Sequence, residues 1–433
     1  MRIFLLSLGC AKNTADSEVL VGMLEAAGHT LVAMAEEADV AFVNTCGFIQ
    51  PAVEESIGAI LDLEQLKEDG RLRKIGVLGC LFNRYGEDLK KEIPSVDIWA
   101  KAEDWSSVLR ALGSPECAFS RGRLPETKRW TRYLKIGEGC DNTCAYCTIP
   151  SIRGRSRSVP VASVVAQAED LVESGARELC LVGQDLTSYG RDLDGKAGLP
   201  DLLAALESAV PEDVWIRLLY LHPARMDEAF IDRLLSFRRV QRYLDIPIQH
   251  IDDEILRRMR RPGNSSHIRR LFSYARQADP LFTLRTTLIV GFPGESEVAF
   301  GGLLDFLGEM SIDRVGAFVF SPEEGTPAAT MDGQIPDAVR ERRYARLMEL
   351  QSGISLERQR LFEGKTMRVL LEEIDVEGGL AWGRSYRDAP EVDGLVGVSP
   401  AAGLREGEFV SVSITEAEEY DLFGVPADDV STT

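Results

Sequence analysis

Three cysteines lie close together near the middle of the 433-residue sequence, at Cys140, Cys144 and Cys147. Their spacing, C-x-x-x-C-x-x-C, lets three thiolates from one loop hold three irons of a four-iron cluster. A fourth cysteine is missing from the run, so one iron would lack a protein ligand and could bind another molecule. The alternative is structural zinc, which usually has four closed ligands in two pairs; neither a second pair nor a histidine lies nearby.

Three further cysteines, Cys10, Cys46 and Cys80, each come directly after an apolar stretch. The stretches are expected to be strands at 2–8, 40–44 and 75–78. Helix-like stretches follow them, and this alternation predicts a parallel sheet. Because ligands bind outside the carboxyl ends of such strands, the three cysteines can converge on one point. Three independent buried cysteines would fall inside a strand as often as just past it, so we expect a second metal or cluster site.

Six more strand-like runs follow the first 124 residues, with helical patterns between them. They are expected at 133–136, 178–182, 215–219, 243–246, 284–290 and 315–320. Repeated βα units of this kind form a parallel barrel or part of one, with the catalytic face at the carboxyl ends of the strands. Cys140 follows the first of these strands, so the cysteine loop is predicted to lie at that face.

The C-x-x-x-C-x-x-C pattern, placed after a strand of an α/β pattern, resembles the signature of the radical S-adenosylmethionine (SAM) enzymes. The stretches 8–13 (LGCAKN) and 44–49 (NTCGFI) look like the N-terminal domain of the methylthiotransferases, the branch of that family with two clusters. The resemblance implies two 4Fe–4S clusters and SAM as cofactors. It assigns the metal ligands as Cys10, Cys46, Cys80, Cys140, Cys144 and Cys147, and leaves Cys117 without a role and Cys180 in the core.

The resemblance also implies a mechanism. A reduced cluster donates one electron to SAM, and a 5′-deoxyadenosyl radical removes hydrogen from an unactivated carbon of the substrate. Sulfur is supplied at the second cluster, and a second SAM supplies the methyl group. Candidate SAM contacts are the residues that follow the second, fourth and fifth barrel strands: Gly183, Gln184, Asp185, Gln249 and Gly291. The two glycines would let a ligand approach the backbone closely.

Candidate substrate contacts come from two places. His222 and His250 follow the third and fourth barrel strands, although His250 can equally be a satisfied polar residue at the barrel rim. Arg153, Arg155 and Arg157 lie just after the cysteine loop. These arginines would meet a substrate carboxylate or the anionic cluster region, and the alternative is a solvated loop.

Short strands punctuated by glycine and proline return near the C-terminus, at 367–372, 380–384, 394–398 and 409–414. They predict a small antiparallel β-barrel of OB-like kind, which the resemblance identifies as a TRAM domain. The expected fold class is thus α/β, with an N-terminal doubly wound parallel sheet, a central partial (β/α) barrel and this C-terminal barrel. The expected domains are 1–123, the cluster domain; 124–362, the radical SAM core; and 363–427, the TRAM domain.

The net charge of −20 disfavours simple nucleic-acid binding, which needs Lys and Arg to neutralise phosphates. The alternative to a basic protein partner is that the acidic residues only keep the chain soluble. The TRAM segment 365–421 has five basic and thirteen acidic residues, which gives 5 − 13 = −8. A basic protein partner therefore fits this segment better than RNA does. Three stretches, 217–223, 245–250 and 384–394, also resemble the methylthiotransferase branch that modifies an aspartate β-carbon of small-subunit ribosomal protein S-twelve.

The sequence thus predicts an aspartate methylthiotransferase that also needs an electron donor and a sulfur donor. Three alternatives remain: a tRNA adenosine methylthiotransferase, a non-catalytic iron–sulfur scaffold or electron carrier, and an RNA-binding protein with a structural zinc site. No stretch is long and apolar enough to span a membrane. The N-terminal apolar run is too short for a signal peptide, and clustered cysteines suit a reducing compartment. We therefore expect a cytoplasmic protein.

Overall fold

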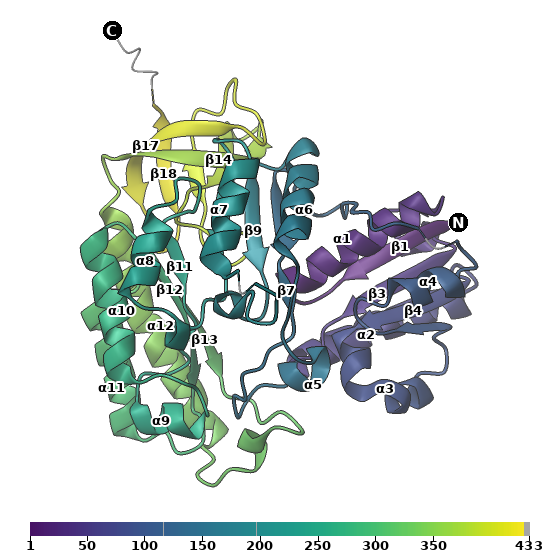
Figure 1. The fold of residues 1–433 in the computed structure, drawn as a ribbon, viewed down its shortest axis with the longest axis horizontal. Coiled ribbons are helices and arrows are strands. Elements are labelled where there is room, and N and C mark those ends of the chain that lie inside the picture. The colour runs from purple at the N-terminus through teal and green to yellow at the C-terminus, as the bar shows by residue number, and fades with distance from the viewer. Residues whose placement is uncertain (116, 196, 428–433) are drawn as a thin grey trace.

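The computed structural model describes residues 1–115, 117–195 and 197–427. The chain forms an N-terminal α/β unit, a central curved α/β unit and a C-terminal β-barrel, in that order (Figure 1). Among the helices of these residues, none has the length and apolarity that crossing a bilayer requires.

The N-terminal unit is a parallel sheet in the order β2-β1-β3-β4-β5. Its elements are β1 (Arg2–Ser7), α1 (Ala11–Ala26), β2 (Thr30–Leu31), η1 (Ala35–Glu37), β3 (Val40–Thr45), α2 (Gln50–Glu68), β4 (Lys74–Gly79), α3 (Cys80–Glu92), β5 (Ile98–Ala100) and α4 (Trp105–Ala111). Helices α1 and α4 pack on one face of the sheet, and α2 and α3 pack on the other. The predicted doubly wound sheet is confirmed, with two short edge strands that the sequence pattern did not reveal.

The central unit contains the six predicted strands in two parallel sheets, β10-β9-β6 and β11-β12-β13. Its strands are β6 (Thr131–Lys135), β7 (Gly137–Glu138), β8 (Arg157–Ser158), β9 (Glu178–Val182), β10 (Trp215–Leu218), β11 (Tyr243–Asp245), β12 (Thr283–Val290) and β13 (Arg314–Val319). The two sheets adjoin where Leu221 donates its N–H to the carbonyl of Asp245 at 2.9 Å. The predicted partial barrel is confirmed.

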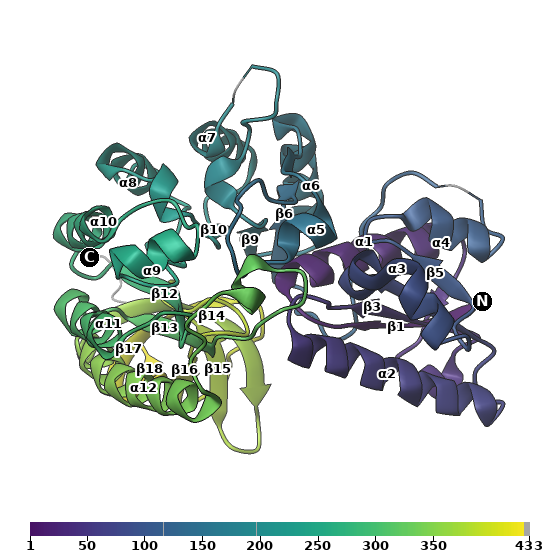
Figure 2. The ribbon, with the colours of Figure 1, turned by 90° about the horizontal axis from the view of Figure 1, so that it is seen from below.

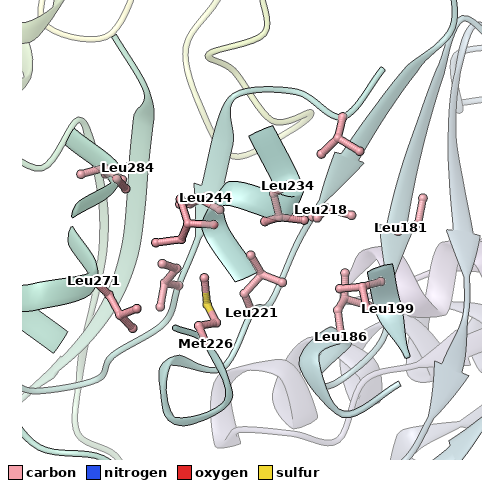
Figure 3. Close-up of a cluster of buried hydrophobic side chains, with 14 of the residues drawn as sticks. Leu181, Leu186, Leu199, Leu218, Leu221, Met226, Leu234, Leu244, Leu271 and Leu284 are labelled. Atoms are coloured by element: carbon pink, nitrogen blue, oxygen red, sulfur yellow. The ribbon is translucent and has the colours of Figure 1, made fainter. Parts of the chain in front are cut away.

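Helices cover the outside of this partial barrel (Figures 1 and 2). These covering helices are α6 (Val161–Glu173), α7 (Leu199–Ala209), α8 (Glu228–Leu235), α10 (Ser265–Ala278), α11 (Glu297–Met310) and α12 (Asp337–Arg360). Shorter segments lie in the loops that follow the strands: α5 (Ile149–Arg153), η2 (Leu186–Ser188), η3 (Pro223–Arg225), α9 (Asp253–Arg258) and η4 (Pro327–Thr330). Successive side chains of each strand point alternately outward, into the hydrophobic core between strands and helices (the outer core), and inward, into the barrel interior. Figure 3 shows Leu181 and Leu218 of the strands in the outer core with Leu199 and Leu234 of the helices.

The C-terminal unit is a closed five-stranded barrel in the order β14-β15-β16-β18-β17. Its strands are β14 (Thr366–Asp375), β15 (Leu380–Arg384), β16 (Val396–Val398), β17 (Phe409–Ala417) and β18 (Leu422–Pro426). The predicted small barrel is confirmed, and the one parallel pairing, between β16 and β18, joins otherwise antiparallel neighbours. The sequence pattern missed β18.

Buried ion pairs fix this C-terminal barrel to the amino ends of the central strands. Glu178, the first residue of β9, lies between Arg217 and Arg384, with an oxygen 2.6 Å from each guanidinium. On the other sheet, Arg314 donates to Asp388 at 2.7 Å. Because these groups are almost fully buried, each charge depends on its partner. The amino end of the partial barrel is therefore covered, and its carboxyl end is left for chemistry.

Candidate functional site

The loop with Cys140, Cys144 and Cys147 lies just beyond β6 and β7, at the carboxyl end of the barrel. Gly139 enters it with φ +78°, and a Cβ there would lie 2.1 Å from the carbonyl oxygen of Arg155, so only glycine fits. Ala145 then donates its N–H to Met259 at 2.8 Å and accepts from Ala328 at 2.9 Å. The loop is therefore held by segments more than a hundred residues away along the chain.

All three sulfurs of this loop are half-buried, and polar side chains approach two of them. Asn142 Nδ2 lies 3.3 Å from the Sγ of Cys140, and Arg261 Nη1 lies 3.9 Å from the Sγ of Cys144. Burial raises the pKa of the Cys147 thiol to about 12. Such a thiol stays protonated until a metal displaces the proton. Three thiols with nearby hydrogen-bond donors fit a cluster of iron and sulfide.

The second set of cysteines comes together at the carboxyl end of the N-terminal sheet, as the sequence predicts. A Cβ on Gly9 would lie 2.8 Å from the Cβ of Cys46, and one on Gly47 would lie 2.9 Å from the carbonyl of Cys80. The three loops that contain Cys10, Cys46 and Cys80 therefore pack directly on one another. Burial raises the pKa of Cys80 to about 11, so these thiols also suit displacement of their protons by a metal.

Arg153 connects the segment after the Cys140 loop to the second set of cysteines. It lies at the end of α5, next to the radical SAM-type loop, yet its Nε is 3.1 Å from the Sγ of Cys80. Its other nitrogens donate to Asn13 Oδ1 at 2.6 Å, Asp16 at 2.8 Å and Glu138 at 3.0 Å. Only 3% of its side chain is exposed. Of the two partners predicted for this arginine, the structure favours the cluster region, because its guanidinium is fully engaged and out of reach of a protein substrate.

The two neighbouring arginines behave differently. Arg155 is 91% exposed and pairs with Asp141, and Arg157 is 67% exposed and pairs with Glu103. Both remain accessible to a partner. Their role as substrate contacts stays a prediction.

The N-terminal and central units meet at these cysteines. Thr148 donates to the carbonyl of Phe48 at 3.1 Å, and Asn83 donates to that of Ile152 at 2.8 Å. Arg84 pairs with Glu323 at 3.1 Å. Helix α5 of the central unit consequently lies beside α3 of the N-terminal unit (Figure 1). Both cysteine sets thus lie beside the interface between the N-terminal and central units.

Gln184 and Asp185 lie beside the Cys140 loop. Asp185 accepts from Asn142 at 3.0 Å and from Arg225 at 2.6 Å. Gln184 donates to Glu138, while its Oε1 is buried without a hydrogen-bond partner among the described residues. A small cavity lined by Gly183, Gln184 and Asp185 adjoins them. The unpaired oxygen can accept a hydrogen bond from a polar ligand, and the cavity beside it, about 10 Å³, has the size of a single water molecule.

Two other candidate SAM contacts have structural roles. Gly291 has φ +75°, and a Cβ there would lie 2.2 Å from the Cγ of Arg340. An arginine of the chain thus fills the space that a side chain at this position would need, and the role of Gly291 as a SAM contact stays a prediction. Gln249, with φ +71°, bonds through its backbone N–H to Thr287 and through its carbonyl to Ile289, both at 2.9 Å.

The two histidines lie deeper than a substrate contact would. His250 is fully buried, accepts from the N–H of Asp252 at 3.0 Å and lies 3.4 Å from Glu295, so a protein substrate cannot reach it. This corrects its assignment as a substrate contact. His222 is 4% exposed. Burial, with Arg261 and Arg225 nearby, lowers its pKa to about 2, so it is neutral. The Nε2 atoms of both rings lack hydrogen-bond partners in the described part of the chain.

Sequence reasoning missed the polar residues that connect the two units. Asp16, on α1, pairs with Lys135 and Arg153, and Glu138 pairs with the same two cations. The signal was present in the stretch 13–18 (NTADSE), where four of the five polar side chains are buried in the folded chain. Buried polar side chains on a helix indicate a specific interface.

Three family models match the chain. They are the uncharacterized protein family UPF0004 over residues 2–101, the radical SAM superfamily over residues 134–307 and the TRAM domain over residues 364–426. The fold resembles that of the radical SAM methyltransferase TsrM from Kitasatospora setae, with a TM-score of 0.54, 15% identity and 76% of each chain covered. It also resembles the radical SAM enzyme OxsB, with a TM-score of 0.51, 12% identity, 80% of this chain and 56% of that one. Fold and cysteine loop together define a radical SAM enzyme, a class that uses a 4Fe–4S cluster and SAM.

Much closer relatives match over nearly the whole chain. The ribosomal protein uS12 methylthiotransferase RimO of Geobacter sulfurreducens is 43% identical over 98% of each chain. That of Heliobacterium modesticaldum is 44% identical over 99% of this chain and 96% of its own. The chain belongs to the RimO family of radical SAM methylthiotransferases.

Proposed function

We propose that this chain transfers a methylthio group to the β-carbon of an aspartate of uS12, the small-subunit protein S-twelve. Its family membership supports this activity. The observation in the molecule that carries the proposal is the presence of two three-cysteine sets beside one interface, where Arg153, six residues after one set, donates to Cys80 of the other. A radical enzyme that only cleaved SAM would need one such set, whereas inserting sulfur needs a second place to hold it.

In this proposal each set holds one 4Fe–4S cluster, so the chain has two. When bound, the clusters and SAM supply one-electron chemistry at carbon, together with the sulfur and the methyl group. The residues of the chain position these groups. Asn142 and Arg261 hydrogen-bond the sulfurs of one loop, and Arg153 does so for Cys80. Gln184 and Asp185 are proposed to bind SAM. The packed interface between the units keeps water from the reacting atoms.

The domain limits that we propose are 1–123, 124–362 and 363–427, since the three family models fall inside them. An electron donor and a sulfur donor must act as further partners, because neither electrons nor sulfur comes from the chain itself. A ribosomal protein as substrate implies action in the cytoplasm.

The surface of the C-terminal barrel supports a basic protein substrate rather than tRNA. Of its five basic residues, Arg384 and Arg387 are buried in ion pairs with the central unit. Only Lys365, Arg368 and Arg405 remain exposed. The exposed acidic residues are Glu373, Asp375, Glu377, Glu391, Glu406, Glu408, Glu416, Glu418 and Glu419. The exposed charge of the barrel is therefore 3 − 9 = −6, so its accessible surface is acidic and repels phosphates.

Neutralising part of this surface should weaken capture of the substrate. We expect replacement of Glu416, Glu418 and Glu419 by glutamine to raise the KM for uS12 roughly threefold or more at low salt, with kcat unchanged, because surface charges chiefly set the association rate. Steady-state kinetics across salt concentrations measures this, and the difference should shrink as salt screens the charges.

A matched control is the triple change Asp62→Asn, Glu68→Gln and Asp69→Asn on α2, which removes the same charge from an exposed surface of the N-terminal unit. Its KM should equal that of the parent enzyme. An equal rise in both triple variants would mean that total charge, and not the C-terminal barrel, attracts the substrate.

The function itself is tested by offering uS12 and bulk tRNA side by side to the anaerobically reconstituted enzyme, with reductant, SAM and sulfide. Mass spectrometry of both should find a methylthio group on an aspartate of uS12. Modification of tRNA adenosine instead would favour the other methylthiotransferase branch. A protein that holds iron but cleaves no SAM under any condition would favour a scaffold or electron carrier.

A further inference from the structure

Lys12 is a cation at the candidate site that makes no ion pair within the described ranges, with the Glu138 carboxylate in electrostatic range of it. It follows Cys10 by two residues, at the start of α1. Its Nζ lies 3.7 Å above the ring centre of Tyr220, and no hydrogen bond or ion pair to this ammonium occurs among the described residues. The side chain is only half-buried. The ring therefore holds the ammonium in place, and its N–H donors have no partner among the described residues.

The other cations around the two cysteine sets are already engaged. Their partners are as follows: Lys135 with Asp16, Arg153 with Asp16 and Glu138, Arg225 with Asp185, Arg285 with Asp245, and Arg261 with the carbonyls of Pro247 and Ile248. Because a cation near the interior normally has an anion or carbonyl close by, the open position at Lys12 indicates a site for an anion from outside the chain.

The ring beneath Lys12 is itself held in an unusual position. Tyr220 follows β10 at the carboxyl end of the barrel and has φ +65°, a conformation that costs energy in an aromatic residue. Its N–H donates to Asp245 at 2.8 Å, and its carbonyl accepts from Leu186 at 3.1 Å. Strain that the surrounding structure maintains in this way is typical of functional sites. The structure thus fixes the place where Lys12 and Tyr220 meet.

Helix α1 brings Lys12 into the interior of the partial barrel. Ala11 and Ala15 of this helix pack against Tyr133, Cys180 and Val182, whose side chains point inward from β6 and β9. Figure 2 shows α1 along the side of the N-terminal unit that faces these strands. Lys12 therefore lies where the carboxyl ends of the barrel strands meet the Cys10 loop.

We infer that Lys12, supported by Tyr220, binds the side-chain carboxylate of the substrate aspartate. The inference rests on the proposed function. The β-carbon of aspartate is bonded directly to the carboxylate carbon, so a cation that holds the carboxylate beside Cys10 places the β-carbon close to the proposed source of sulfur. A neutral asparagine would make no ion pair with Lys12. The residue thus positions and selects the substrate.

Binding without turnover tests this assignment. The reconstituted enzyme, kept anaerobic and without reductant, is titrated with fluorescent uS12-derived peptides that carry the target aspartate or an asparagine in its place. The parent enzyme should prefer aspartate. Lys12→Met should lower the affinity for the aspartate peptide about 10- to 100-fold, the range expected for a charge-assisted hydrogen bond. It should leave the asparagine peptide unaffected, and Lys12→Arg should restore part of the preference.

Iron content and SAM affinity of each variant accompany the titration. Equal losses for both peptides, or an unchanged preference in Lys12→Met, would overturn the assignment. A loss of SAM affinity instead would mean that Lys12 binds the carboxylate of SAM, which also overturns it. These outcomes differ from failure of the proposed function, in which the parent enzyme would modify tRNA and leave uS12 unmodified.

Discussion

Replacing Cys144 by alanine is expected to abolish reductive SAM cleavage. Cys144 is the middle ligand of the proposed SAM-binding cluster, and two thiolates cannot hold three irons. The second set of cysteines is untouched, so about half of the iron should remain. Release of 5′-deoxyadenosine under reducing, anaerobic conditions measures the first effect, and iron and sulfide analysis measures the second.

Cys117→Ala is the matched control. The Sγ of Cys117 lies 3.3 Å from the carbonyl of Met23, and its side chain packs beside the core of the N-terminal unit, away from both cysteine sets. This variant should keep full iron and normal SAM cleavage. If Cys144→Ala cleaved SAM at the parent rate, the ligand assignment would be wrong.

Replacing Arg153 by methionine is expected to destabilise the chain by about 3 kcal/mol, the lower end of the cost of removing one partner from a buried ion pair. Asp16 and Glu138 would keep only Lys135 as a shared cation. The change also removes the hydrogen bond to Cys80, so the N-terminal cluster should be lost more easily. Urea denaturation of the metal-free protein measures the first effect, and the rate of iron release to a chelator measures the second.

Arg155→Met provides the comparison two residues away. Arg155 has the same charge as Arg153, but its side chain is 91% exposed. Exposed ion pairs contribute little to the free energy of unfolding. Its denaturation midpoint should match that of the parent protein. Equal midpoints for both variants would contradict the view that Arg153 joins the two units.

The ion pairs of Glu138 at the same interface should make the stability of the folded chain depend on pH. Burial alone would raise the pKa of Glu138, but Lys135 and Arg153 lower it to about 2 from a usual 4.5. A carboxylate with a lowered pKa stabilises the folded state above its unfolded pKa. This contribution should therefore be complete above about pH 4.5 and be lost as the pH falls toward 2. In Arg153→Met the folded-state pKa of Glu138 should lie closer to 4.5, so the loss of stability on acidification should be smaller and should end at a higher pH.

The features that could be predicted from the sequence are those whose pattern is visible within a short stretch of the chain. The spacing of Cys140, Cys144 and Cys147 revealed one ligand set, because a single loop contains all three. The rule that ligands gather at strand carboxyl ends brought Cys10, Cys46 and Cys80 together, although long stretches separate them. The long, apolar strands were found for the same reason, since their pattern is visible in a short window.

What could not be predicted depends on contacts between distant segments. Arg153 and Arg155 look alike in sequence, yet one is enclosed by Asp16 and Glu138 and the other is in solvent. Nothing in the local sequence indicates that Arg340 packs against Gly291. The short strands β2, β5 and β18 are defined by their neighbours, because so few residues show no clear alternation. Such features come from tertiary packing, which no local pattern contains.

The most direct test of the central claim follows a single hydrogen atom. uS12 that contains aspartate deuterated at the β-carbon is incubated anaerobically with the reconstituted enzyme, reductant, SAM and sulfide. Mass spectrometry should find deuterium in the released 5′-deoxyadenosine and a methylthio group at the β-carbon of one aspartate. Deuterium-free 5′-deoxyadenosine alongside unmodified uS12 would contradict the account, because SAM would then be cleaved without reaction at that carbon.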